Sequence, residues 1–268
     1  MTDDQKSAGF RPRGIYLLPN LFTTGALFAG FYSLVSAING HFTAAAVAVF
    51  VAGILDGLDG RIARLTNTAT EFGVQYDSLS DMVSFGLAPA ILIYAWALRS
   101  LVELGNFWGK LAWAAAFLYA ACAALRLARF NTQAGVADKR YFQGLASPAA
   151  AGILMALVWT LEDLGLSPDQ HTSIAMLALV MTVIVALLMV SNVRYLSFKN
   201  WQGRQKLRFV HVLVPLLIIV LLSLDTSKVL LGFGVIYVAS GPIMTVSGRA
   251  KARWRHRSDD LGPTETPP

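Results

Sequence analysis

Four aspartates lie close together in the sequence, between two long apolar runs. At about 100 degrees per residue, Asp56 and Asp59 fall roughly 60 degrees apart on a helix, so their carboxylates share one face. Asp77 and Asp81 are spaced by one helical turn and project together from a second helix. The linker over residues 65–74 is short enough to make the two helices antiparallel neighbours. The spacing therefore predicts that the four carboxylates converge.

Carboxylates at the edge of an apolar region need a cationic partner, because unpaired charges are costly to desolvate. Arg61 and Arg64 are one kind of partner. An all-oxygen cluster without His or Cys instead favours hard divalent cations such as Mg²⁺, Mn²⁺ or Ca²⁺. Four carboxylates suit two such ions, and two-metal sites support phosphoryl transfer. Gly60 and Ala63 would leave room for a substrate group, and Arg64 could then donate to a phosphate.

The composition is typical of an integral membrane protein, since 55% of the 268 residues are hydrophobic and 14% are charged. A helix that crosses the hydrocarbon core needs about 20 mostly apolar residues. The sequence predicts an all-α, polytopic bundle of about eight transmembrane helices. The predicted spans are Pro19 to Ile38, Phe42 to Leu58, Tyr76 to Leu98, Trp108 to Leu127, Ser147 to Leu161, Ser173 to Val190, Phe209 to Leu224 and Val229 to Met244.

Lysine and arginine predict the orientation, because loops on the cytoplasmic side carry more positive charge. The basic residues gather at both termini and at residues 61–64, 126–140 and 194–208. Both termini and the acidic cluster are therefore expected on the cytoplasmic side. The net charge of +6 suits anionic headgroups, and no DNA-binding motif accompanies it, so no nucleic-acid partner is expected.

We expect three regions along the chain. Residues 1–13 form a cytoplasmic N-terminal segment, and residues 14–248 form one membrane domain. Residues 249–268 form a tail that is basic and then disordered.

The aspartates belong to a longer pattern, Asp56-x₂-Asp59-Gly60-x₂-Ala63-Arg64-x₈-Gly73-x₃-Asp77-x₃-Asp81. This pattern resembles the signature of the CDP-alcohol phosphotransferase family at every fixed position. The resemblance implies that an alcohol displaces CMP from a CDP-linked donor at a two-metal site on the cytoplasmic face. The ions implied are Mg²⁺ or Mn²⁺, with Ca²⁺ as an alternative.

The resemblance also implies roles for individual residues. The four aspartates bind metal, and Asp81 in addition accepts the proton of the attacking hydroxyl group. The residues implied for donor binding are Asn20, Thr23, Gly60, Ala63, Arg64, Thr70 and Gly73. Asn20 and Thr23 could instead serve as helix caps after Pro19.

The flanking sequence narrows the resemblance to bacterial, membrane-embedded phosphatidylserine synthases. IYLLPNLFTTGALFAGFY, EFGVQYDSLSDMVSFGLAPA, ALRLARFNTQ and DKRYFQGLASPAAAG carry it. This subfamily implies CDP-diacylglycerol as donor, L-serine as acceptor, a homodimer surrounded by membrane lipid, and the bacterial inner membrane as location. The acceptor carboxylate would need a cation, for which Arg126 and Arg129, with Asn131 beside them, are the candidates. The two arginines could instead be topology signals.

Two alternatives remain open from the sequence. The same donor could react with glycerol 3-phosphate or inositol phosphate, although an acceptor with a phosphate would need a denser basic pocket. The aspartates could also form the pathway of a divalent-cation transporter, but such sites usually lie near the membrane midplane, whereas these residues are predicted at one face.

Overall fold

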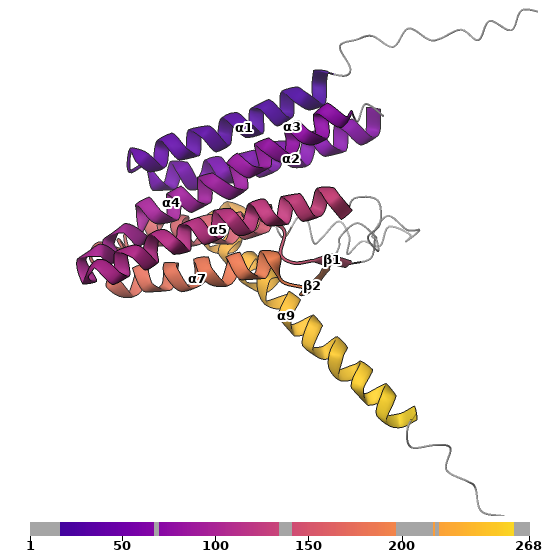
Figure 1. The fold of residues 1–268 in the computed structure, drawn as a ribbon. Helices are drawn as coiled ribbons and strands as arrows, with labels where there is room; N and C mark the ends of the chain where they lie inside the picture. Colours follow the sequence, from indigo (N-terminus) through magenta and orange to yellow (C-terminus); the bar gives the residue numbers. More distant parts are fainter. Residues whose placement is uncertain (1–16, 67–69, 134–140, 197–216, 218–219, 260–268) are drawn as a thin grey trace, which may run out of the picture.

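The computed structural model describes residues 17–66, 70–133, 141–196, 217 and 220–259, which form a bundle of long helices (Figure 1). The helices are α1 (Leu17–Ile38), α2 (Phe42–Thr66), α3 (Glu71–Asp81), the π-helix η2 (Met82–Leu87), α4 (Ala88–Trp96), the 3-10 helix η3 (Leu98–Leu104), α5 (Asn106–Gln133), α6 (Ser147–Asp163), α7 (Thr172–Val190) and α9 (Thr226–Asp259). The predicted all-α fold is confirmed, with one addition. Two three-residue strands, β1 (Tyr141–Gln143) and β2 (Arg194–Leu196), pair antiparallel.

Six helices of the described residues are long and apolar enough to cross a membrane, so this is a multi-pass membrane protein. They are Pro19–Ile38, Phe42–Thr66, Glu71–Leu104, Asn106–Thr132, Thr172–Val190 and Thr226–Thr245. The predicted span at Ser147 forms α6, which has 17 residues and is shorter than the other six. The predicted span Phe209 to Leu224 lies largely outside the described residues, and of it only residues 217 and 220–224 are described as helical.

The third span begins earlier than the sequence predicts. Thr70 accepts a hydrogen bond from the Gly73 backbone N–H at 3.0 Å, which caps the N-terminus of α3. From there α3, η2, α4 and η3 form one continuous element over Glu71–Leu104. The start at Glu71 places Asp77 and Asp81 further inside the helix than the predicted start at Tyr76 does.

Helix α6 forms much of the core. Its consecutive residues 153–158 are all buried, and the small side chains of Ala150 and Ala151 are fully covered. Large apolar side chains on other helices are exposed instead, such as Phe28 on α1 and Phe117 on α5. Large apolar side chains outside and small side chains inside suit a bundle in lipid. The apolar side chains can face hydrocarbon, while the small residues let the helices approach closely.

The acidic end of the bundle is built by α1, α2 and α3, which lie together in the indigo to purple part of Figure 1. Ser80 donates to the Thr23 carbonyl at 3.2 Å, and Ser84 donates to the Ala26 carbonyl at 3.1 Å. A Cβ atom at Gly30 would lie 2.5 Å from the Ser84 hydroxyl oxygen, so the small residue permits this close approach. The two serines and the glycine therefore fix α3 and η2 against α1.

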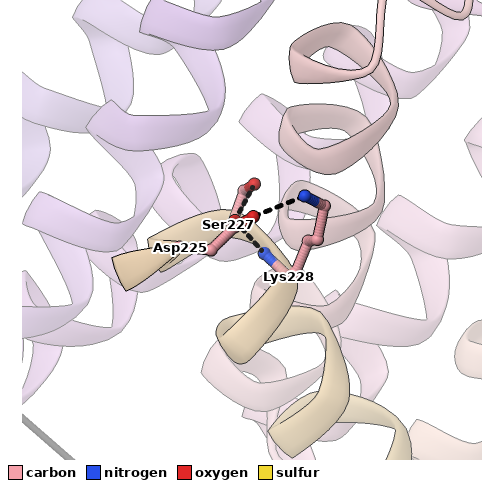
Figure 2. Close-up of polar contacts among 3 residues, drawn as sticks. All are labelled: Asp225, Ser227 and Lys228. Carbon is pink, nitrogen blue, oxygen red and sulfur yellow. Dashed lines mark hydrogen bonds and ion pairs between the residues drawn. The ribbon is translucent and has the colours of Figure 1, made fainter. Parts of the chain in front are cut away.

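Helix α9 starts at a polar cap (Figure 2). The Asp225 carboxylate accepts hydrogen bonds of 3.2 Å from the Lys228 backbone N–H and from the Ser227 hydroxyl, and it also pairs with the Lys228 ammonium group. The hydrogen bond from the Lys228 side chain holds the pKa of Asp225 below its usual range. The cap therefore fixes the residue at which α9 begins.

The distal part of α9 leaves the bundle, as the yellow end in Figure 1 shows. Residues 249–259 of the predicted tail belong to this helix, so the basic part of the tail is helical. The predicted N-terminal segment, residues 1–13, and the remaining tail, residues 260–268, lie outside the described residues.

Candidate metal and substrate site

Three of the four predicted metal ligands form a tight cluster. Asp56 and Asp59 on α2 and Asp77 on α3 each offer a carboxylate oxygen, and these oxygens lie within 4.8 Å of one another. Asp81 lies one turn beyond Asp77 on α3, and its carboxyl group interacts with those of both Asp56 and Asp77. The predicted convergence of carboxylates from two helices is therefore present in the structure.

Helix α1 contacts the acidic cluster through Thr23. The Thr23 hydroxyl donates a 2.7 Å hydrogen bond to Oδ2 of Asp59, and both side chains are buried. The same threonine provides the carbonyl that accepts the hydrogen bond from Ser80. One residue of α1 thus contacts the aspartate-bearing segments of both α2 and α3.

The donor atoms fit a divalent cation. Oδ1 of Asp77 is buried and has no hydrogen-bond partner. Between the described residues, no ion pair joins a lysine or arginine to any of the four aspartates. Grouped carboxylates without a bonded cation repel one another, and oxygen ligands are those that Mg²⁺, Mn²⁺ and Ca²⁺ prefer. The residues that would hold a metal are thus Asp56, Asp59 and Asp77, with Asp81 adjacent.

A second group of predicted residues meets at the start of α3. A Cβ atom at Gly73 would lie 3.2 Å from Oγ1 of Thr70 and 3.5 Å from Oδ1 of Asn20. The neighbouring Thr24 hydroxyl is hydrogen-bonded to the Tyr76 hydroxyl at 2.9 Å. The predicted donor-binding residues Asn20, Thr70 and Gly73 therefore lie together between α1 and α3.

The remaining donor candidates lie on the open side of α2. Arg64 is exposed, and its Nε donates to the Gly60 carbonyl at 2.7 Å. Among the described residues outside its own backbone, the only atom within 4 Å of a Cβ built at Gly60 is Nη2 of Arg64, at 4.0 Å. Ala63 is half-buried on the next turn. This surface has the space that the sequence predicts for a substrate group.

Among the predicted acceptor residues, Arg126 on α5 interacts directly with the acidic cluster. Its Nη1 donates to the Ser147 hydroxyl at 2.8 Å, and its guanidinium interacts with Asp81. Its Nε is buried and has no partner. Since an arginine nitrogen can only donate, this N–H is available to an acceptor atom.

The other two predicted acceptor residues have different environments. Nδ2 of Asn131 donates to the Ser78 hydroxyl at 2.9 Å, which ties the end of α5 to α3 between the two aspartates of that helix. Nη2 of Arg129 donates to Oδ1 of Asn192 at 3.1 Å, in the connection before β2. Arg126 and Asn131 are therefore close to the aspartate-bearing helix, whereas Arg129 contacts the segment that follows α7.

Sequence reasoning missed three polar residues near the cluster. Ser80 and Ser84 bind α1, and Ser147 binds Arg126. A signal for the two serines existed, because they are four residues apart on the helix that carries the aspartates. Ser147 had no such signal, since it is the first residue of a separate span.

The comparison with known proteins identifies the family. Residues 16–190 match the family model for CDP-alcohol phosphatidyltransferase. The chain belongs to this family. Members of the CDP-alcohol phosphatidyltransferase family depend on divalent metal ions, which agrees with the acidic cluster.

Individual relatives carry more specific names. The chain is 37% identical over 223 residues to CDP-diacylglycerol–serine O-phosphatidyltransferase of Helicobacter pylori, covering 83% of this chain and 90% of the relative. A protein of the same name from Methanocaldococcus jannaschii is 34% identical over 152 residues, which covers 57% of this chain and 63% of the relative. Archaetidylserine synthase of Methanothermobacter thermautotrophicus is 32% identical over 197 residues, covering 73% and 74%.

Proposed function

We propose that this member of the family transfers the phosphatidyl group of CDP-diacylglycerol to the hydroxyl group of L-serine, with release of CMP. The observation that carries the proposal is the acidic cluster of Asp56, Asp59 and Asp77 with its unpartnered oxygen. The name of the Helicobacter pylori relative, which aligns over most of both chains, supports serine as the acceptor. The half-buried Arg126 beside Asp81 provides a cation for an amino-acid carboxylate.

The reaction replaces one phosphorus–oxygen bond with another. The serine oxygen attacks the phosphorus that bears diacylglycerol, the bond to the CMP oxygen breaks, and the serine proton passes to a base. We assign Asp81 as this base, since it lies one turn beyond Asp77 and interacts with Asp56. Two divalent cations, Mg²⁺ or Mn²⁺, or alternatively Ca²⁺, held by the four aspartates would neutralise the diphosphate and the developing charge.

The donor would lie against α1, α2 and the start of α3. Asn20, Thr70 and Gly73 surround one position between α1 and α3. Gly60, Ala63 and Arg64 would contact the diphosphate from α2, while Thr23 holds Asp59 in place. Positioning of this kind supplies much of the rate acceleration in phosphoryl transfer.

The acceptor would lie on the α5 side of the acidic cluster. In this arrangement the N–H at Nε of Arg126 donates to the serine carboxylate, and Asn131 and Arg129 fix the end of α5. Glycerol 3-phosphate and inositol phosphate carry an additional phosphate group. Of the three basic or amide candidates only Arg126 has a buried, unpartnered donor, which favours an acceptor with one carboxylate.

We also propose the membrane arrangement. About eight spans follow from the long apolar runs, and the placement of both termini and the site on the cytoplasmic side follows from the distribution of lysine and arginine. The compartment would be the bacterial inner membrane, and the assembly a homodimer. The proposed regions are residues 1–13, 14–248 and 249–268.

The test is formation of labelled lipid by the purified protein from CDP-diacylglycerol and Mn²⁺ or Mg²⁺. L-serine, glycerol 3-phosphate and inositol phosphate are supplied in separate reactions, and CMP is measured in each. We expect lipid product and CMP with L-serine alone. Product with another alcohol would refute serine as the acceptor. Absence of CMP with all three would refute the transferase, and uptake of Mn²⁺ by vesicles containing the protein would then favour the transporter.

A further inference from the structure

Helix α9 lies beyond the family match at residues 16–190, yet it contacts the core of the bundle. Gly234 faces Ile153 of α6, where an added Cβ atom would lie 3.3 Å from the isoleucine side chain. Gly241 faces Tyr195 of β2 so closely that a Cβ atom would overlap the ring. The small residues on one side of α9 therefore let it dock against α6 and β2.

Tyr195 holds this docking in place. Its side chain is buried, and its hydroxyl donates to the Val238 carbonyl of α9 at 3.3 Å. Burial raises the pKa of Tyr195 to about 12, so the hydroxyl stays protonated and able to donate at neutral pH. Its ring also packs against the ring of Tyr237, with the ring centres 5.5 Å apart. The strand β2 thus fixes the position of Tyr237.

The fixed Tyr237 is one of the groups near Arg126. The two side chains interact electrostatically, and Tyr119 and Asp81 are the other groups that act on the same guanidinium. The Tyr119 hydroxyl is already engaged, since it donates to the Phe85 carbonyl at 3.0 Å. The Tyr237 hydroxyl makes no hydrogen bond to any described side chain or carbonyl. The Tyr237 hydroxyl and Nε of Arg126, whose side chains interact, therefore both remain available as donors to a ligand.

We infer that Tyr237 is an acceptor-binding residue, whose hydroxyl group and Arg126 together bind the carboxylate of an amino-acid alcohol. The inference rests on the proposed function, and it assigns part of the acceptor pocket to a helix outside the family match. A phenol hydroxyl donates readily to a carboxylate, and two donors from different helices fix its orientation better than one. The α9 helix then serves as one wall of the pocket.

The experiment compares Tyr237→Phe with Tyr195→Phe in the full-length protein. Both variants lose one hydroxyl group and keep the ring. For Tyr237→Phe we expect the KM for L-serine to rise about tenfold, with the KM for CDP-diacylglycerol unchanged, because a hydrogen bond to a charged group is lost. For Tyr195→Phe we expect reduced thermal stability and a smaller rise in the KM for L-serine, because the retained ring still packs against Tyr237.

Inhibition by two fragments of serine separates binding from a structural effect. Glycerate keeps the carboxylate and hydroxyl, whereas ethanolamine keeps the ammonium and hydroxyl. Tyr237→Phe should weaken inhibition by glycerate and leave inhibition by ethanolamine unchanged. Equal weakening of both, or no change in either, would overturn the inference. Failure of the unmodified protein to use serine would instead refute the proposed function.

Discussion

Thr23 on α1 donates a 2.7 Å hydrogen bond to Asp59 on α2, and both side chains are buried. The contact joins a residue of the first span to a ligand candidate of the second. It holds one oxygen of a carboxylate that belongs to the acidic cluster. A support of this kind usually contributes strongly to metal affinity.

Replacing Thr23 with valine keeps the shape of the side chain and removes the hydrogen bond. We expect the concentration of Mn²⁺ or Mg²⁺ that gives half-maximal activity to rise about tenfold, because Asp59 is no longer oriented. Titration of activity with each metal measures this change. Thr182→Val, at a buried threonine of α7 that bonds to the Ala178 carbonyl, is the control. The same shift in both variants would contradict the specific role of Thr23.

Asp77→Asn tests the metal site directly. The substitution keeps the size of the side chain and removes one negative charge, so activity should fall by about two orders of magnitude or more. Mn²⁺ should also stabilise the unmodified protein against heating, and EDTA should reverse that effect. Asp77→Asn should show a smaller stabilisation. Full metal-dependent stabilisation of the variant would show that Asp77 is not a ligand.

Asp81→Asn should lower the rate of phosphatidyl transfer without preventing the donor from binding. An amide cannot accept the serine proton, and loss of a general base typically lowers turnover about a hundredfold or more. Binding of CDP-diacylglycerol, measured by protection against thermal unfolding, should be largely retained. Near-normal turnover would exclude Asp81 as the base.

Gly30→Ala tests the packing that positions α3. The added methyl group would lie 2.9 Å from the Ser84 Cα atom, so α1 and η2 must separate. Overpacking of this kind costs about 1–3 kcal/mol, and the displaced Ser84 would also weaken its bond to α1. We expect a lower unfolding temperature together with reduced activity. The control is Gly232→Ala on α9, where an added Cβ meets no atom within 4 Å; an equal loss there would show that the effect is not specific.

The acidic cluster could be predicted because its signal is local. The spacing of the aspartates on two adjacent helices places them together once the short linker is recognised. The fold class followed from composition, since the long apolar runs require helices in a membrane. The bounds of the third span were less accurate, because the cap at Thr70 extends the helix through a polar segment that hydropathy alone leaves out.

Contacts between distant segments could not be predicted in this way. Nothing in the sequence indicates that Arg129 binds Asn192, or that Tyr195 and Tyr237 share a contact. Such pairs depend on how separate helices and strands dock, which periodicity within one helix does not encode. Arg129 was expected to bind the acceptor because it is close to Arg126 in the sequence. In the structure Arg126 bonds to Ser147 of α6, whereas Arg129 bonds to Asn192 before β2.

The π-helix Met82–Leu87, directly after Asp81, also has no sequence signal. A π-turn takes up more residues than an α-turn, so it changes the phase between the two halves of one helix. Before it, Asp77 and Asp81 lie at the acidic cluster, whereas Phe85 within it and Ala88 directly after it are buried in the core. The π-helix therefore lets the aspartate-bearing half and the core-packing half of the span each take their own rotation about the helix axis without a break in the chain.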